Sequence, residues 1–131
     1  MTLVDSGDLG KIDWIRCRYG KSQELESLGW RDDPDLAGGG ILLDQGIHGL
    51  DLILALMGQP DEVQSLISTT KGERSILESN AFIQLRNNKR GISASLHSTS
   101  TDWRYTFALE VSMTKGAIVL NGLRTPSGKY G

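Results

Sequence analysis

The sequence predicts an α+β domain in which an antiparallel-dominated open sheet packs one face against a single long central helix. Three observations carry this prediction. The segment Ile41 to Met57 is nearly all apolar and contains no proline, which gives it the length and composition of a buried helix. Several short segments with strand composition follow, and their short links favour antiparallel pairing. Apolar and polar residues alternate strictly from Trp103 to Val111, as in a half-buried strand.

The composition is that of one ordinary domain covering residues 1–131. Hydrophobic residues make up 38% of the chain and charged residues 23%, with a net charge of -2. This charge argues against nucleic-acid binding, and no signal peptide or membrane span is expected. Cys17 is the only cysteine, so neither an internal disulfide nor a cysteine-based zinc site can form. A single cysteine fits a reducing, cytoplasmic location.

The residues before the central helix predict a helix end, a strand and a loop. Thr2 to Gly10 has the composition of a helix tail with a glycine exit, and Lys11 to Tyr19 that of a strand. Gly20 to Gly40 is polar and rich in glycine, so we expect a loop there, with a short helical turn near Ser22 to Leu28.

The second half of the chain predicts strands. Gly58 and Pro60 end the helix in the order of a C-terminal cap and a breaker. The tail from Gly122 is predicted to be loop or disorder. We expect about five or six strands in all, the later ones at Glu62 to Thr70, Asn80 to Arg86, Gly91 to Ser100, Trp103 to Val111 and Gly116 to Asn121.

One helix covers only one face of such a sheet. The opposite face includes Ser93, Ser95, His97 and Thr99 from a single strand. A sheet covered on one side exposes the other to water or to a partner. We therefore expect a homo-oligomer that forms through the open face.

Three polar residues interrupt the apolar helix. Asp44, His48 and Asp51 stand at i, i+4 and i+7, so they share one face, and burying them without partners would be costly. This pattern predicts a site at the mouth of a cleft. The residues expected to cover the other faces are Leu43, Ile47, Leu50, Ile53, Leu54, Leu56 and Met57.

Two interpretations of Asp44 and His48 remain open from the pattern alone. In one, His48 transfers a proton and Asp44 orients it. In the other, Asp44 caps the helix or favours its dipole, and the pair is structural. A metal site is disfavoured, because zinc needs a third protein ligand and the soft candidates Cys17 and His97 are distant in sequence.

The glycines around the helix start predict close packing. Gly38 to Gly40 permits unusual dihedrals and a tight entry into the helix. It is not a dinucleotide fingerprint, so we assign no cofactor-binding residue. Gly46 and Gly49 disfavour a helix, so we expect them to pack closely against a strand or a ligand. Arg31 has the chemistry to bind an anionic group, although a Trp30–Arg31 pair is more often a packing tryptophan beside an exposed arginine.

The motif from Gly38 to His48, preceded by Trp30-Arg31 and followed by Asp51-Leu52 and Gly58, resembles the C-terminal domain of the Gfo/Idh/MocA oxidoreductases. Both flanks support the resemblance, and it covers most of the chain. The segments concerned are Leu9 to Ile12, Thr101 to Gly116 and Asn121 to Leu123.

The resemblance implies a function that the pattern alone leaves open. It makes His48 and Asp44 the catalytic pair, with Trp30, Arg31 and Asp51 at the substrate. The intact enzyme would use NAD or NADP, held by an N-terminal Rossmann domain, to oxidise or reduce a sugar or nucleotide-sugar. This chain lacks that domain and the family's catalytic lysine, so we expect a fragment that is inactive alone and binds no cofactor. The alternative is a non-enzymatic sheet module for dimerisation or partner binding.

Overall fold

A computed structural model describes residues 2–22, 35, 38–69, 77–125 and 128–130. The predicted helical turn near Ser22 to Leu28 lies almost entirely outside these residues. The elements are α1 (Thr2–Asp5), β1 (Ile12–Ser22), the π-helical segment η2 (Leu42–Gly46), α3 (Ile47–Met57), β2 (Glu62–Ser68), β3 (Asn80–Asn87), β4 (Ile92–Asp102), β5 (Thr106–Met113), β6 (Gly116–Asn121), β7 (Leu123–Thr125) and β8 (Gly128–Tyr130).

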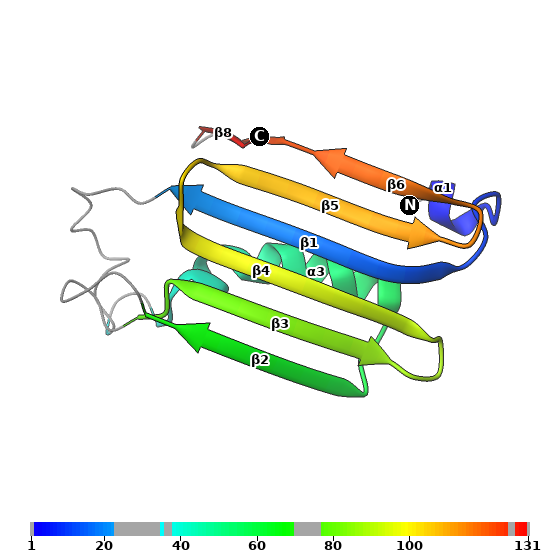
Figure 1. Ribbon diagram of the computed structural model, residues 1–131, viewed down its shortest axis with the longest axis horizontal. Helices are drawn as coiled ribbons and strands as arrows, with labels where there is room; N and C mark the ends of the chain where they lie inside the picture. Colours follow the sequence, from blue (N-terminus) through cyan, green and yellow to red (C-terminus); the bar gives the residue numbers. More distant parts are fainter. Residues whose placement is uncertain (1, 23–34, 36–37, 70–76, 126–127, 131) are drawn as a thin grey trace.

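The main sheet has six strands in the order β2-β3-β4-β1-β5-β6 (Figure 1). All neighbours are antiparallel except β1 and β4, which are parallel. The predicted α+β class and antiparallel-dominated sheet are therefore confirmed. β1 lies between β4 and β5, a position that the order of the strands along the sequence did not predict. This position brings Cys17 of β1 opposite Leu96 of β4 and Leu109 of β5.

The side chains of β1 show how the two sheet faces differ. Ile15, Cys17 and Tyr19 are at most 7% exposed and point towards the helix. Arg16 and Arg18, between them, point away and are exposed. This period of two is that of a sheet with one buried face. We call the face that carries Arg16 and Arg18 the open face.

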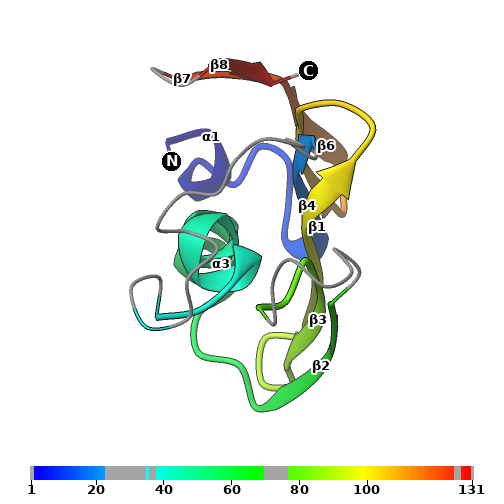
Figure 2. The same ribbon diagram turned by 90° about the vertical axis from the view of Figure 1, so that its left-hand side faces the viewer.

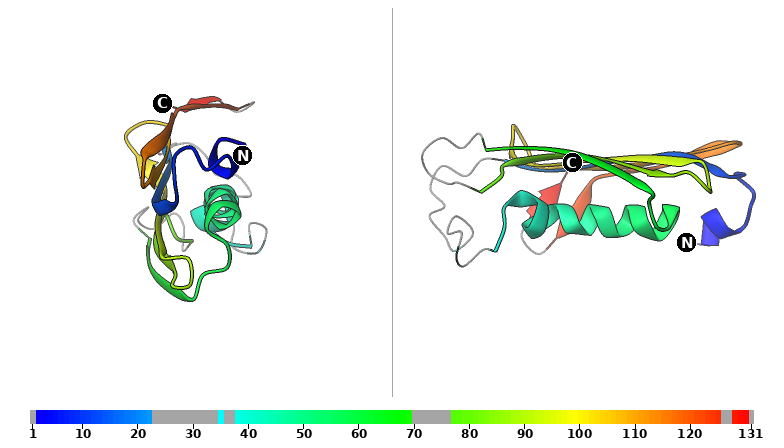
Figure 3. Two further views of the ribbon diagram at one scale, coloured as in Figure 1. Left: turned by 90° about the vertical axis from the view of Figure 1, so that its right-hand side faces the viewer. Right: turned by 90° about the horizontal axis from the view of Figure 1, so that it is seen from below.

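Helix α3 lies along the face opposite the open face, over β1 and β4 (Figure 2). Seen along the sheet edge, the helix lies on one side only, and no described element covers the open face (Figure 3). Gly49 makes the close approach possible, because a Cβ there would lie 2.9 Å from Leu96 Cδ1 and 3.1 Å from Cys17 Sγ. Close packing of this glycine against strands is thus confirmed.

The helix buries a narrower stripe than the sequence led us to expect. Gly49, Ile53, Leu56 and Met57 are buried against the sheet. Leu43 and Ile47, expected on buried faces, are instead 48% and 47% exposed. That expectation was wrong because the helix packs against a sheet on one side only. The helix ends as predicted: Gly58 has φ +77° and its N–H donates to Leu54 O at 2.9 Å.

Two predictions about the second half are also corrected. The strand expected from Trp103 begins at Thr106, because the chain must first cross from β4 over β1 to β5, and Trp103 is 79% exposed. The tail expected to be loop or disorder contains β7 and β8, which pair antiparallel from Leu123↔Tyr130 to Thr125↔Gly128. The glycine and proline content of this tail concealed its β-compatible residues, such as Leu123, Thr125 and Tyr130. No helix in the described ranges is long and apolar enough to span a membrane.

Candidate functional site

The three polar residues of the apolar helix stand on successive turns. Asp44 belongs to η2, His48 to the first turn of α3 and Asp51 to the next turn. His48 and Asp51 are exposed and Asp44 is half-buried. The exposure of His48 and Asp51 removes the cost of burying these two side chains and makes them accessible to a ligand. Trp30 and Arg31, the other predicted site residues, lie outside the described residues.

Apolar side chains border this polar group. Leu43 and Ile47, next in sequence to Asp44 and His48, leave about half of their surfaces exposed. Exposed apolar surface beside polar groups is typical of a surface that another domain or a ligand covers. An imidazole beside a carboxylate and apolar surface can exchange a proton with a hydroxyl held above it.

The entry turn, residues Gly38 to Ile41, connects the helix start to the sheet. Gly38 has φ +75°, and Gly40 is buried. The N–H of Gly40 donates to Glu78 Oε1 at 3.0 Å, and the N–H of Ile41 to Glu78 O at 3.1 Å. A Cβ on Gly40 would overlap the carbonyl oxygen and the carboxyl group of Glu78. The predicted role of these glycines, a tight entry into the helix, is confirmed.

Glu78 is the site residue that sequence reasoning missed. It stands 38 residues from Gly40 and two residues before β3, where no local pattern marks it. The helix needs it because its N-cap residue, Ile41, makes no side-chain cap hydrogen bond. A carboxylate near a helix N-terminus accepts hydrogen bonds from free N–H groups and interacts favourably with the helix dipole.

A second contact fixes the helix start against β4. Ser98 is fully buried, and its hydroxyl donates to Ile41 O at 3.4 Å. A Cβ on Gly46 would lie 2.9 Å from Ser98 Oγ. The close packing predicted for Gly46 is therefore also against a strand.

The remaining candidate groups lie elsewhere. Burial raises the pKa of the Cys17 thiol to about 11, so it is a protonated thiol at neutral pH and packs as a small apolar residue. His97 lies on the open face, on the other side of the sheet from the helix that carries His48. Within the described part of the chain, no group of three or more His, Cys, Asp or Glu residues is arranged to hold a metal ion.

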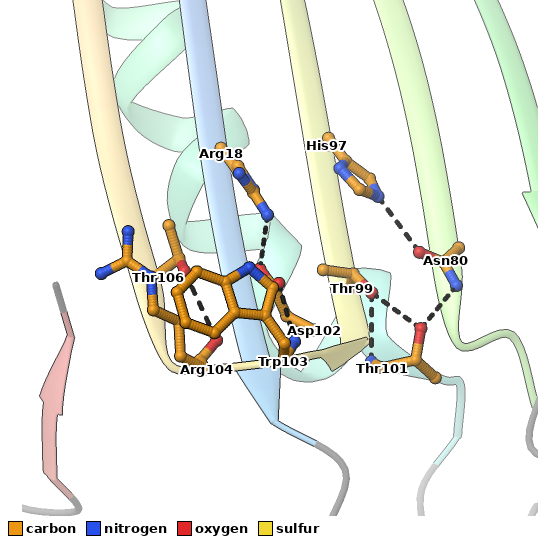
Figure 4. A network of polar contacts seen from close by, with 9 residues as sticks. All are labelled: Arg18, Asn80, His97, Thr99, Thr101, Asp102, Trp103, Arg104 and Thr106. Atoms are coloured by element: carbon orange, nitrogen blue, oxygen red, sulfur yellow. Dashed lines mark hydrogen bonds and ion pairs between the residues drawn. The ribbon is translucent and has the colours of Figure 1, made fainter.

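His97 belongs to a polar network at one end of the open face (Figure 4). Its Nε2 donates to Asn80 Oδ1 at 3.1 Å, and its ring stacks on Phe82. Burial lowers the pKa of His97, and the Arg18 guanidinium lowers it further while Asp102 opposes the shift. Arg18 pairs with Asp102 at 2.8 Å. The network joins three strands and is separate from the group on the helix.

Comparisons with known proteins place the chain. Residues 1–119 match the model of the GFO/IDH/MocA C-terminal domain. A comparison with curated protein sequences gave no significant match. Among solved structures, levoglucosan dehydrogenase in complex with NADH and levoglucosan matches with a TM-score of 0.83 and 24% identity, over 92% of this chain and 35% of that one.

A second similar structure is the aldose-aldose oxidoreductase from Caulobacter crescentus complexed with glycerol. The TM-score is 0.81 and the identity 28%, over 92% of this chain and 36% of that one. This chain thus spans little more than a third of the length of these structures. The family match extends over the entry turn, the helix, strands β1 to β5 and the first four residues of β6. The chain belongs to the GFO/IDH/MocA C-terminal domain family.

Proposed function

We propose that this chain is the substrate-binding and catalytic half of an NAD(P)-dependent oxidoreductase that acts on a hydroxyl of a sugar or nucleotide-sugar. The observation that carries the proposal is that the helix presents His48 and Asp51 exposed and Asp44 half-buried, with the half-exposed Leu43 and Ile47 next to them in sequence. In a member of this family, such a surface suits a small polyhydroxyl substrate enclosed by a second domain. The names of the similar structures, which include a levoglucosan dehydrogenase and an aldose-aldose oxidoreductase, support a sugar.

His48 is the proposed acid/base residue. It would take the proton of the substrate hydroxyl during oxidation and return it during reduction. Asp44, one turn earlier, would orient the imidazole and contact the substrate. Asp51 lies on the same side of the helix and would bind a further hydroxyl, together with Trp30 and Arg31.

The nicotinamide of bound NAD(P) supplies hydride transfer in such an enzyme. The described residues fit a cofactor held by another domain. The sequence contains no G-x-G-x-x-G turn to hold a pyrophosphate, while the exposed Leu43 and Ile47 offer apolar surface for a covering domain. We therefore propose that the isolated chain binds NAD(P) weakly or not at all, and that the whole enzyme works in the cytoplasm.

The open face is the proposed surface for homo-oligomer formation. It carries exposed Leu66 and Phe82 on β2 and β3, and Arg16, Arg18 and Glu110 on β1 and β5. Apolar and oppositely charged groups on one surface allow a two-fold pairing of identical faces. The same observation supports the second candidate function, a non-enzymatic module that only associates.

One experiment separates the two candidates. The chain is fused behind the NAD(P)-binding domain of levoglucosan dehydrogenase, and nicotinamide reduction is followed with a panel of sugars. Turnover of at least one sugar supports the oxidoreductase. A folded fusion that binds NAD(P) and self-associates, yet turns over none of the panel, supports the non-enzymatic module.

A further inference from the structure

We propose that Glu78 is a positioning residue for the acid/base pair, acting through the entry turn of the helix. The inference rests on the proposed function of Asp44 and His48. Glu78 does not belong to the helix, and its part in setting the geometry comes from the contacts of its main chain and its carboxylate.

The sheet fixes Glu78 through its neighbour Ser79. Ser79 is 1% exposed. Its N–H donates to Ser68 O at 2.9 Å, and its carbonyl accepts from the N–H of Ser100 at 2.9 Å. The residue after Glu78 is therefore held between the end of β2 and the end of β4. Because of these two hydrogen bonds, the main sheet fixes the position of Glu78.

Two hydrogen bonds connect Glu78 to the start of the helix. Its carboxylate accepts from the N–H of Gly40 at 3.0 Å, and its carbonyl accepts from the N–H of Ile41 at 3.1 Å. Both donors stand at the helix start: Ile41 is the N-cap residue, and Gly40 is the residue before it. A Cβ on Gly40 would overlap Glu78, so only a glycine at this position allows so close an approach.

The connection to the site is short. The N–H of Asp44 donates to Gly40 O at 3.0 Å, so the residue held by Glu78 is bonded directly to the main chain of Asp44. His48 follows Asp44 by one turn. A shift of the entry turn would therefore move Asp44 first and His48 with it. Displacements of about 1 Å at a reacting group can cost roughly a hundredfold in rate.

The two substitutions of Glu78 that test this are Glu78→Ala and Glu78→Gln. The alanine removes the acceptor of the Gly40 bond, whereas the glutamine keeps a carbonyl oxygen at its end. The matched controls are Glu62→Ala and Glu62→Gln. The side chain of Glu62 is 63% exposed on an edge strand, and its carboxylate lies 3.9 Å from Arg86.

The first measurement uses NMR of the 131-residue chain. With only two histidines, the His48 and His97 ring signals report the helix and the open face separately. In Glu78→Ala we expect amide exchange at Gly40 to rise roughly tenfold, and the His48 ring signal to shift while that of His97 stays. Glu78→Gln should recover most of both. An unchanged His48 signal in Glu78→Ala would overturn the proposal, even if exchange at Gly40 rises.

The second measurement uses the fusion that carries the NAD(P)-binding domain. Per folded active site, Glu78→Ala should lower kcat roughly ten- to a hundredfold, leave KM for NAD(P) unchanged, and be largely rescued by glutamine. A purely structural role would lower only the folded fraction, and a kcat per folded site equal to that of the Glu62 controls would overturn the proposal. If the unsubstituted fusion turns over no sugar, the proposed function is wrong. The His48 ring signal of the 131-residue chain then still tests whether Glu78 positions the helix start.

Discussion

The ring of His97 lies flat on the ring of Phe82, with the centroids 4.0 Å apart and the planes 11° apart. The two residues are direct partners across β3 and β4. On the other side of His97, its partner on β1 is Arg18. A protonated imidazole at this position would be partly removed from water and would lie next to the Arg18 guanidinium. Both effects disfavour the charged ring, so the stacked His97 is favoured in its neutral form.

This stack predicts that acid weakens the fold. The folded pKa of His97 lies below its ordinary value near 6.5, through burial first and Arg18 second, with Asp102 opposing. The unfolded chain therefore binds the proton more readily. The contribution of neutral His97 to stability is complete above about pH 6.5, and falls as the pH drops through that value to the folded pKa.

Urea unfolding of the chain from pH 7.5 down to about pH 5 measures the effect. His97→Gln keeps an N–H donor for Asn80 but cannot titrate, so its stability should fall less steeply with acid than that of the unsubstituted chain. His48→Gln, at the exposed histidine, is the matched control and should keep the original slope. Equal slopes in all three proteins would contradict this role for His97.

Gly49→Ala should destabilise the domain. Alanine favours a helix over glycine by up to about 1 kcal/mol. The added Cβ, however, would lie 2.9 Å from Leu96 Cδ1, and Leu96 is only 2% exposed. We expect a net loss of roughly 1–2 kcal/mol in the free energy of unfolding, as is usual for overpacking.

A double-mutant cycle with Leu96→Val gives the control for Gly49→Ala. Valine lacks the δ-methyl that the new Cβ would meet, so the two substitutions together should cost less than their sum. Additive costs would mean that the helix does not press on Leu96.

Local sequence patterns predicted most of the secondary structure, whereas the contacts between elements could not be predicted from them. The helix and most strands were predicted from local patterns: the strand composition of β1, the strict alternation in β5 and the apolar segment ended by Gly58. The insertion of β1 between β4 and β5 is a tertiary choice, and no local pattern encodes it. The same holds for Glu78, whose contact with Gly40 exists only once the sheet has formed. Exposure of Leu43 and Ile47 depends on how many sides of the helix are covered.

Self-association through the open face predicts opposite results for two neighbouring residues of β2. Leu66 is 77% exposed and pairs with Phe82, in the row that continues to His97 on the open face. Ile67 is 62% exposed and pairs with Ala81, in the row that continues to Ser98 on the helix side. Leu66→Asp should therefore shift the chain towards monomer, whereas Ile67→Asp should leave its association unchanged.

Sedimentation equilibrium over a range of concentrations measures this difference. Both substitutions replace an exposed apolar side chain on the edge strand with a carboxylate, so they differ chiefly in the face they alter. A chain that is monomeric at every concentration, or one that Ile67→Asp dissociates as strongly as Leu66→Asp, would contradict pairing through the open face.

The chemistry of the helix gives the last prediction, on the fusion with an NAD(P)-binding domain. His48→Ala should lower kcat by roughly two to four orders of magnitude, the scale expected for loss of a general acid/base. Asp44→Asn should lower activity as well, through orientation and substrate contact. His97→Ala should change turnover little, since His97 lies across the sheet. Because His48 is exposed, His48→Ala should also leave the unfolding midpoint of the chain nearly unchanged. Near-normal turnover in His48→Ala together with a clear loss of stability would instead make the pair structural.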